Sequence, residues 1–206
     1  MQRLKFEQEF TQLTSMDDES IVLAEAALVA ARHRYPALDS AKYLGQLDDL
    51  AHDVQGLGPL SVDDWREALT HVLFARFDMK GNAQDYYDPR NSYLNDVLER
   101  RLGIPITLSV IYLEVAWRAG ARVAPVSFPG HFLVRLYGSG KDELFVDPFN
   151  EGRALSTDDL HQQLRRTLGD DHASQVSLAD AMSGVSKREV LARMFRNLVA
   201  IYAGND

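Results

Sequence analysis

The sequence predicts an α+β fold in which N-terminal helices and one buried central helix pack on a small antiparallel sheet. Three observations lead to this prediction. Apolar residues recur at three- and four-residue steps through the first 80 residues, one later helix is apolar on nearly every side, and short apolar runs separated by turn residues follow Gly120. The 206 residues are enough for one sizeable core with a small helical extension.

Three helices are predicted in the N-terminal part of the chain. Asp17 or Asp18 can cap the first, the second starts at about Ser40, and the third begins at Ser61 with Asp64 as a weak capping box. The apolar residues expected to face the core are Ile21, Val22, Ala26, Val29 and Ala30, then Tyr43, Leu44, Leu47 and Leu50, and finally Trp65, Leu69, Val72 and Leu73. We expect these helices to form the wall of the core rather than a site.

Residues 91–120 contain a short helix and then the helix that should be most deeply buried. Asn91 or Ser92 can cap the short helix, and Gly103 can end it. Pro105 suits the first position of the next helix, whose apolar residues cover almost its whole circumference. Such a helix is typical of a core. Its N-terminus then directs free backbone N–H groups into the interior or into a cleft.

Three short strands are predicted over residues 122–128, 131–137 and 143–146. The last two form a hairpin with His131 and Asp147 at matching ends. A three-residue loop sets these two side chains directly opposite each other, and a five-residue loop leaves them diagonal on one face. A loop of two or four residues places the two side chains on opposite faces of the hairpin. On one face they can act as the base and the orienting group of a triad. The alternative is that the histidine only caps a strand and the aspartate only starts an Asp-Pro turn.

Two more helices are predicted towards the C-terminus. The first covers residues 155–170, and either Ser156 or Thr157 can cap it. Residues 171–186 have the pattern of a loop. Residues 187–203 form a last amphipathic helix with apolar side chains along one face.

The composition excludes several classes of protein. The net charge is −8 and no basic cluster is longer than two residues, so we expect no nucleic-acid partner. No apolar run reaches the length of a membrane span, and MQRLKFEQEF lacks the pattern of a secretory signal. We therefore expect a cytoplasmic protein that does not bind a membrane.

Cysteine is absent from the chain, which excludes disulfides, thiolate zinc sites and a cysteine nucleophile. The histidines have no metal-ligand spacing, and there is neither a calcium loop nor a phosphate-binding glycine loop. We expect no cofactor.

Three separate motifs resemble the transglutaminase-like core of the bacterial SirB-type family, and a eukaryotic F-box protein carries a similar domain. The motifs are DYYDPRNSYLNDVLERRLGIPITLSVIYLEVAWRAG, FPGHFLVRL and FVDPF, in that order, and the resemblance covers roughly residues 20–160. It implies a papain-like arrangement, with a cysteine opening a buried helix, a histidine starting a strand and an aspartate on the next strand. His131 and Asp147 match the histidine and the aspartate, so the resemblance favours the paired interpretation.

The cysteine is where this chain departs from the family. The resemblance places Pro105 at its position, and the nearest hydroxyls belong to Thr107 and Ser109. A hydroxyl needs far more activation than a thiol. The sequence therefore favours a non-catalytic protein that binds a protein or peptide in a regulatory role. The alternative is a hydrolase or acyl-transferase with Ser109 or Thr107 as nucleophile beside a His131–Asp147 pair. A hydroxyl about 3 Å from the histidine ring would favour that enzyme.

A polar cluster precedes the buried helix and is the candidate binding site. Asn91, Asn95 and Glu99 are spaced by four, so they can form one stripe on a helix. With the next helix N-terminus and His131, they would line a cleft for an acidic or peptide-like ligand. A solvated face, or capping of helix ends, is the alternative. The candidate binding residues are Tyr87, Asn91, Asn95, Glu99, Arg100 and Arg101.

We divide the chain into a domain over residues 1–170 and a C-terminal region over residues 171–206. The end of the second region, REVLARMFRNLVAIYAGND, resembles the helix that begins the tetratricopeptide-like repeats of SirB-type proteins. An apolar helix stripe without its partner predicts a surface for homodimerisation.

Overall fold

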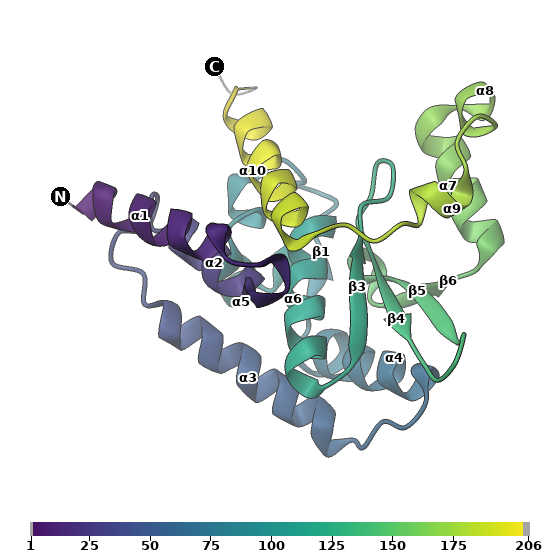
Figure 1. The fold of residues 1–206 in the computed structure, drawn as a ribbon, viewed down its shortest axis with the longest axis horizontal. Coiled ribbons are helices and arrows are strands. Elements are labelled where there is room, and N and C mark those ends of the chain that lie inside the picture. Colours follow the sequence, from purple (N-terminus) through teal and green to yellow (C-terminus); the bar gives the residue numbers. More distant parts are fainter. Residues whose placement is uncertain (1, 204–206) are drawn as a thin grey trace.

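The predicted α+β architecture is confirmed by a computed structural model, which describes residues 2–203 and the side chains from residue 7 onward. The ends of the two predicted regions, residues 1 and 204–206, lie outside the described residues. Helix α6 runs through the middle of the molecule, with α3 and the N-terminal helices on one side and the sheet on the other (Figure 1).

The helices are α1 (Gln2–Ser15), α2 (Leu23–Ala31), α3 (Ser40–Gly56), α4 (Val62–Thr70), α5 (Leu94–Arg100), α6 (Pro105–Ala119), α7 (Thr157–Leu168), α8 (Asp170–Ala173), α9 (Leu178–Ala181) and α10 (Lys187–Ala203). Four short helical turns are η1 (Asp18–Ser20), η2 (His71–Arg76), η3 (Pro89–Asn91) and η4 (Pro148–Asn150). The strands are β1 (Lys80–Gly81), β2 (Leu102–Gly103), β3 (Arg122–Val126), β4 (Leu133–Tyr137), β5 (Glu143–Asp147) and β6 (Arg153–Leu155).

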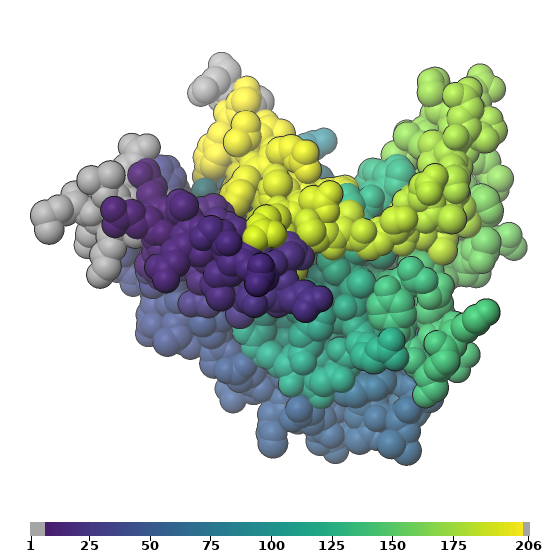
Figure 2. All heavy atoms as spheres, viewed as in Figure 1, coloured from purple at the N-terminus to yellow at the C-terminus, as the bar shows by residue number. Residues whose placement is uncertain are grey.

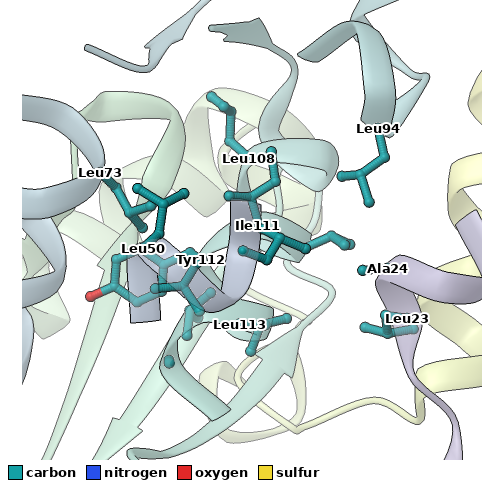
Figure 3. Packing of buried hydrophobic residues seen from close by; sticks show 14 of the residues in the cluster. Leu23, Ala24, Leu50, Leu73, Leu94, Leu108, Ile111, Tyr112 and Leu113 are labelled. Atoms are coloured by element: carbon teal, nitrogen blue, oxygen red, sulfur yellow. The ribbon is translucent and has the colours of Figure 1, made fainter. Parts of the chain in front are cut away.

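Helix α6 is the buried helix that the sequence predicts. Pro105 is its first residue, and Gly120 closes it in the left-handed conformation with φ 97°. Every α6 residue except Trp117 and Arg118 is buried. In Figure 3, its apolar side chains lie between residues of α3 and η2 on one side and residues of α2 and α5 on the other. The labelled side chains include Leu50, Leu73, Leu108, Ile111, Tyr112, Leu113, Leu23, Ala24 and Leu94.

The main sheet has four antiparallel strands in the order β3-β4-β5-β6, and β1 and β2 form a separate parallel pair. Tyr137 pairs with Glu143, so the hairpin loop has five residues, and the three-residue alternative is wrong. The loop closes through a bond from the Gly138 N–H to the Asp142 carbonyl, 2.7 Å, and Gly140 adopts φ +63°. The strand predicted to start at His131 starts at Leu133, and β6 was not predicted.

Helix ends that depend on neighbouring residues agree with the prediction. Ser61 caps α4 in a reciprocal capping box with Asp64, and Ser156 caps α7. Helix ends set by distant residues do not agree. Neither Asp17 nor Asp18 caps α2, because the buried carboxylate of Glu114 in α6 accepts the Ala24 N–H at 3.0 Å instead.

The predicted ends of the short helix are also wrong. Tyr93, rather than Asn91 or Ser92, precedes α5, because Asn91 is held in η3. Arg101 ends α5 in the left-handed conformation with φ 60°, two residues before Gly103, which belongs to β2.

The region predicted to be a loop, residues 171–186, contains α9 and most of α8. With α7 they cover the sheet over a second apolar cluster formed by Val126, Phe128, Leu133, Phe145, Leu160 and Leu164. Figure 1 shows this arm rising at one edge of the sheet, apart from α10. Helix α10 itself packs on α2 and α6. Among the described residues, none of the helices combines the length and apolar character that a bilayer-spanning segment requires.

Candidate functional site

His131 and Asp147 form a buried hydrogen-bonded pair. The Nε2 atom of His131 lies 2.8 Å from Oδ1 of Asp147. Asp147 ends β5, and His131 stands two residues before β4, so the five-residue loop leaves them on one face in diagonal positions. The predicted pairing is confirmed. Because a carboxylate only accepts hydrogen bonds, Nε2 carries the hydrogen, and Nδ1 is the acceptor when the ring is neutral.

Asp147 also opens the turn η4, so this side chain both pairs with the histidine and starts an Asp-Pro turn. Its Oδ1 accepts the N–H groups of Phe149 at 3.0 Å and Asn150 at 3.3 Å, and its Oδ2 accepts Nδ2 of Asn150 at 2.6 Å. Burial raises the pKa of Asp147, but the bonds and charge of His131 and the bonds from Asn150 outweigh burial and lower it. Asp147 therefore holds the histidine ring as a carboxylate.

The loop that carries His131 lies between α7 and α10. Arg193 of α10 donates from Nη2 to the His131 carbonyl at 2.8 Å and from Nη1 to Oγ of Ser127. On the other side, a Cβ atom at Gly130 would come within 2.6 Å of Thr167 in α7. Figure 2 shows the surface hollowed between α10 and the α7–α9 arm.

The sequence pattern does not identify Arg193 as part of the site. Burial lowers the pKa of its guanidinium, which stacks 5.4 Å from the Phe132 ring. The signal that could have found it is a basic residue among the inward-facing apolar positions of an amphipathic helix. Its partner, however, lies 62 residues earlier in the chain.

An aromatic row leads from the pair to the surface. The Phe149 ring stands nearly perpendicular to the His131 ring at 6.0 Å and to the Tyr86 ring at 6.3 Å, and Tyr86 meets Tyr87 at 5.4 Å. Tyr87 is 75% exposed. Burial first, and then Tyr87, raises the pKa of Tyr86, although Arg193 lowers it. We name His131, Phe149, Tyr86 and Tyr87 the aromatic row.

The candidate nucleophiles are committed to other contacts. The Thr107 hydroxyl donates to the Asn91 carbonyl at 2.7 Å and accepts the Ile104 N–H at 3.1 Å. The Ser109 hydroxyl donates to the Phe132 carbonyl at 3.3 Å. Both side chains are fully buried, and within the described part of the chain neither is hydrogen-bonded to the His131 ring. Helix α6, which starts at Pro105, packs against η4, the turn that follows Asp147. The start of this helix supplies no thiol, and its two hydroxyls already bond to backbone carbonyls.

The predicted polar stripe is divided between two places. Asn91 is fully buried in η3 and serves the loop before it. Its Nδ2 donates to the carbonyls of Asp85 at 2.7 Å and Tyr86 at 3.2 Å, and its Oδ1 accepts bonds from Asn82 and Arg100. Every polar atom of this amide has a partner, so Asn91 supports the position of Tyr86.

Arg100 and Arg101 also hold local structure. Arg100 forms an ion pair with Asp88 at 3.1 Å. The hydrogen bond from Arg90 is the largest influence on Asp88, and it lowers the pKa of that carboxyl in spite of partial burial. Arg101 lies over the Phe77 ring at 5.0 Å.

Asn95 and Glu99 contact a different part of the molecule, beside Tyr43 of α3. The residues lining that cavity do not include His131, so the structure does not bring these two side chains into a cleft with the pair.

No group of three or more His, Asp or Glu side chains is arranged to hold a metal ion within residues 2–203.

Comparisons with known proteins match one family profile and several relatives. The family profile of the transglutaminase-like superfamily matches residues 41–196. A UPF0162 protein of Xylella fastidiosa is 42% identical over 200 residues, which cover 94% of this chain and 69% of that protein. A UPF0162 protein of Pseudomonas aeruginosa is 31% identical, covering 93% and 68%. F-box only protein 21 of Mus musculus is 33% identical over 66% of this chain and 21% of its own length. No solved structure gives a significant match.

Proposed function

The chain belongs to the transglutaminase-like superfamily, and from that premise we propose that it is a non-catalytic member which binds a protein or peptide segment beside His131 in a regulatory role. The single observation that carries this proposal is the state of the nucleophile position. The chain has no cysteine, and the hydroxyls of Thr107 and Ser109 are buried and bonded to backbone carbonyls. A nucleophile must lie within hydrogen-bond reach of its base.

The aromatic row supports binding of a polypeptide. Tyrosine side chains contribute much of the free energy of many protein interfaces, because they bury a large rigid ring and keep a polar end. The row runs from an exposed tyrosine, Tyr87, to the His131 ring, whose Nδ1 has no hydrogen-bond partner among the described residues. A peptide N–H can donate to that nitrogen while neighbouring apolar groups of the peptide cover the rings.

Three finer assignments belong to the same proposal. We assign the protein to the SirB type, on the three ordered motifs around Pro105, His131 and Asp147. We interpret residues 171–206 as the start of a tetratricopeptide-like region, on the resemblance of α10. We place the protein in the cytoplasm, which cell fractionation would test.

Capture of partners from the native lysate is the test of binding. We expect His131→Ala and Tyr87→Ala each to lose the same captured proteins that wild type retains. Leu60→Ala is the matched control, since this side chain is 92% exposed and lies between α3 and α4. Retention of all partners by the double variant His131→Ala/Tyr87→Ala would contradict the binding site.

The intact His131–Asp147 pair is the observation that favours the alternative, a hydrolase or acyl-transferase with Ser109 or Thr107 as nucleophile. An acyl-phosphonate or chloromethyl probe distinguishes the two. We expect no covalent labelling by mass spectrometry. Labelling that disappears in both His131→Ala and Ser109→Ala, or in both His131→Ala and Thr107→Val, would overturn the non-catalytic proposal.

A further inference from the structure

A cavity separate from the aromatic row lies beside α5. Its volume is about 420 Å³, and its polar wall consists of Tyr35, Tyr43, Asn95, Asp96 and Glu99. Three of these residues come from α5, one from α3 and one from the turn after α2. Among them, Asn95 indicates which kind of ligand the cavity can bind.

The amide oxygen of Asn95 has no hydrogen-bond partner among the described residues, although the residue is only 4% exposed. Its Nδ2 donates to Oδ1 of Asp96 at 3.2 Å. Since a carboxylate accepts but does not donate, this bond fixes which end of the amide is the oxygen. Oδ1 is therefore a buried acceptor that calls for an N–H or O–H donor.

The two tyrosine hydroxyls of the cavity do not supply that donor. The Tyr35 hydroxyl donates to Oδ2 of Asp96 at 2.5 Å, and the Tyr43 hydroxyl donates to Oε1 of Glu99 at 2.6 Å. Burial, and then Asp96, raises the pKa of Tyr35 to about 12, so its hydroxyl keeps its hydrogen. The cavity thus presents two carboxylates, an amide oxygen and two aromatic rings.

Two cations of the chain itself stand at the rim. Lys42 donates to Oε1 of Glu99 at 2.9 Å and lies 4.8 Å from the Tyr43 ring centre. Oε2 of Glu99 has no bond among the described residues. Arg34 lines the same cavity and lies against the Tyr35 hydroxyl. Both side chains are exposed. They show that the rim of the cavity attracts cations, but they leave the buried amide oxygen of Asn95 without a donor.

We propose that this cavity binds an alkylguanidinium group, namely the arginine side chain of a peptide. A guanidinium has five N–H donors in a planar fork, so it can satisfy Asn95 and a carboxylate together and stack on a tyrosine ring. An ammonium is a point charge that makes fewer of these contacts at once. The assignment is independent of the proposed function at His131 and needs no chemistry there.

Isothermal titration calorimetry on the full chain tests this. The probes are a blocked Gly-Arg-Gly tripeptide, its Gly-Lys-Gly counterpart and arginine amide. We expect the arginine peptide to bind roughly tenfold more tightly than the lysine peptide, as the additional charge-assisted bonds imply. Arginine amide binding as tightly as the peptide would identify a small molecule as the source of the guanidinium, whereas weaker binding would identify a peptide.

The variants locate the site. Asn95→Leu, nearly isosteric but without the amide, should bind the arginine peptide roughly tenfold more weakly. Glu99→Gln, at the exposed end of the cavity, should also weaken binding of the arginine peptide. This substitution does not alter the packing of the core. Lys42→Met should bind several-fold more tightly, because a competing cation is gone. Leu60→Ala should match wild type.

Three outcomes would overturn the proposal. They are equal affinity for the two tripeptides, unchanged affinity in both Asn95→Leu and Glu99→Gln, and no binding at millimolar peptide, which would leave water as the partner of Asn95.

Discussion

A single carboxylate, that of Asp147, fixes both the histidine ring and the turn that follows β5. It accepts bonds from His131, Phe149 and Asn150. Burial raises its pKa, but the bond and charge of His131 and the bonds from Asn150 outweigh burial and lower the pKa below that of the unfolded chain. A depressed folded pKa stabilises the protein above the unfolded pKa of about 3.9. That stabilisation is lost as the pH falls through the folded pKa.

The first prediction concerns Asp147→Asn. The asparagine keeps the size of the side chain but loses the charge, so we expect the free energy of unfolding to fall by about 2 kcal/mol at pH 7. The difference from wild type should shrink as the pH falls from about 4 through the lower folded pKa, because the carboxylate is protonated first in the unfolded chain and then in the folded protein. Urea denaturation at several pH values measures it. Asp49→Asn in α3 is the control, and equal pH profiles for the two variants would contradict the prediction.

A second prediction concerns Gly81, which leaves room for Phe149, a member of the aromatic row. A Cβ atom there would lie 2.6 Å from the Phe149 carbonyl oxygen and 2.7 Å from its ring. We expect Gly81→Ala to destabilise the protein by about 2 kcal/mol through this overlap. Gly45→Ala is the matched control in α3, where nothing lies within 4 Å. It should stabilise by about 0.5–1 kcal/mol. A Gly81→Ala variant as stable as wild type would contradict the close contact.

At the residue scale, the sequence predicts which side chains share a face of the sheet, because side chains alternate between faces along a strand. His131 and Asp147 share a face for either odd loop length, so the wrong loop did not affect their pairing. The partners of Asn91, Thr107 and Arg193 depend on how distant segments pack. Local patterns therefore indicate a capping or binding role for Asn91 and a candidate nucleophile at Thr107, and they give no indication of Arg193.

The same division holds for whole elements. The starts of α4, α6 and α7 follow from local caps at Ser61, from Pro105 and from Ser156. The start of α2 depends on Glu114, ninety residues away, whose buried carboxylate no local rule connects with that helix. The short elements β6, α8 and α9 are stabilised by the second apolar cluster rather than by their own periodicity.

The third prediction concerns the contact between α10 and the His131 loop. Arg193→Met removes the bonds to Ser127 and to the His131 carbonyl but keeps a long side chain over Phe132. We expect amide hydrogen exchange in residues 127–132 to become roughly tenfold faster, because local opening loses two bonds. Arg196→Met, one turn further along α10, is the control. Equal exchange in both variants would show that Arg193 does not hold the loop.

At the scale of the molecule, α10 has a second surface. With α2 it lines a mainly apolar cavity of about 570 Å³ that includes Val199 and Tyr202. Val199 is 67% exposed. The sequence stripe predicted homodimerisation through this helix, and we retain that as a proposal.

Sedimentation equilibrium tests the fourth prediction. We expect a concentration-dependent dimer, and Val199→Glu should raise its dissociation constant by at least roughly tenfold, because a charge would be buried in the interface. Leu60→Glu, on another exposed apolar residue, should have no effect. A strict monomer at high concentration would end the dimer proposal.

Helix α10 contributes residues to two separate places on the molecule. One side of this helix forms the apolar cavity with α2, and its Arg193 grips the carbonyl of His131. Thermodynamic linkage is reciprocal, so any ligand that shifts α10 changes affinity at the histidine by the same factor as a ligand there changes affinity for α10. A ligand that binds the α2–α10 cavity and shifts α10 would therefore be detected as a change in binding affinity beside His131.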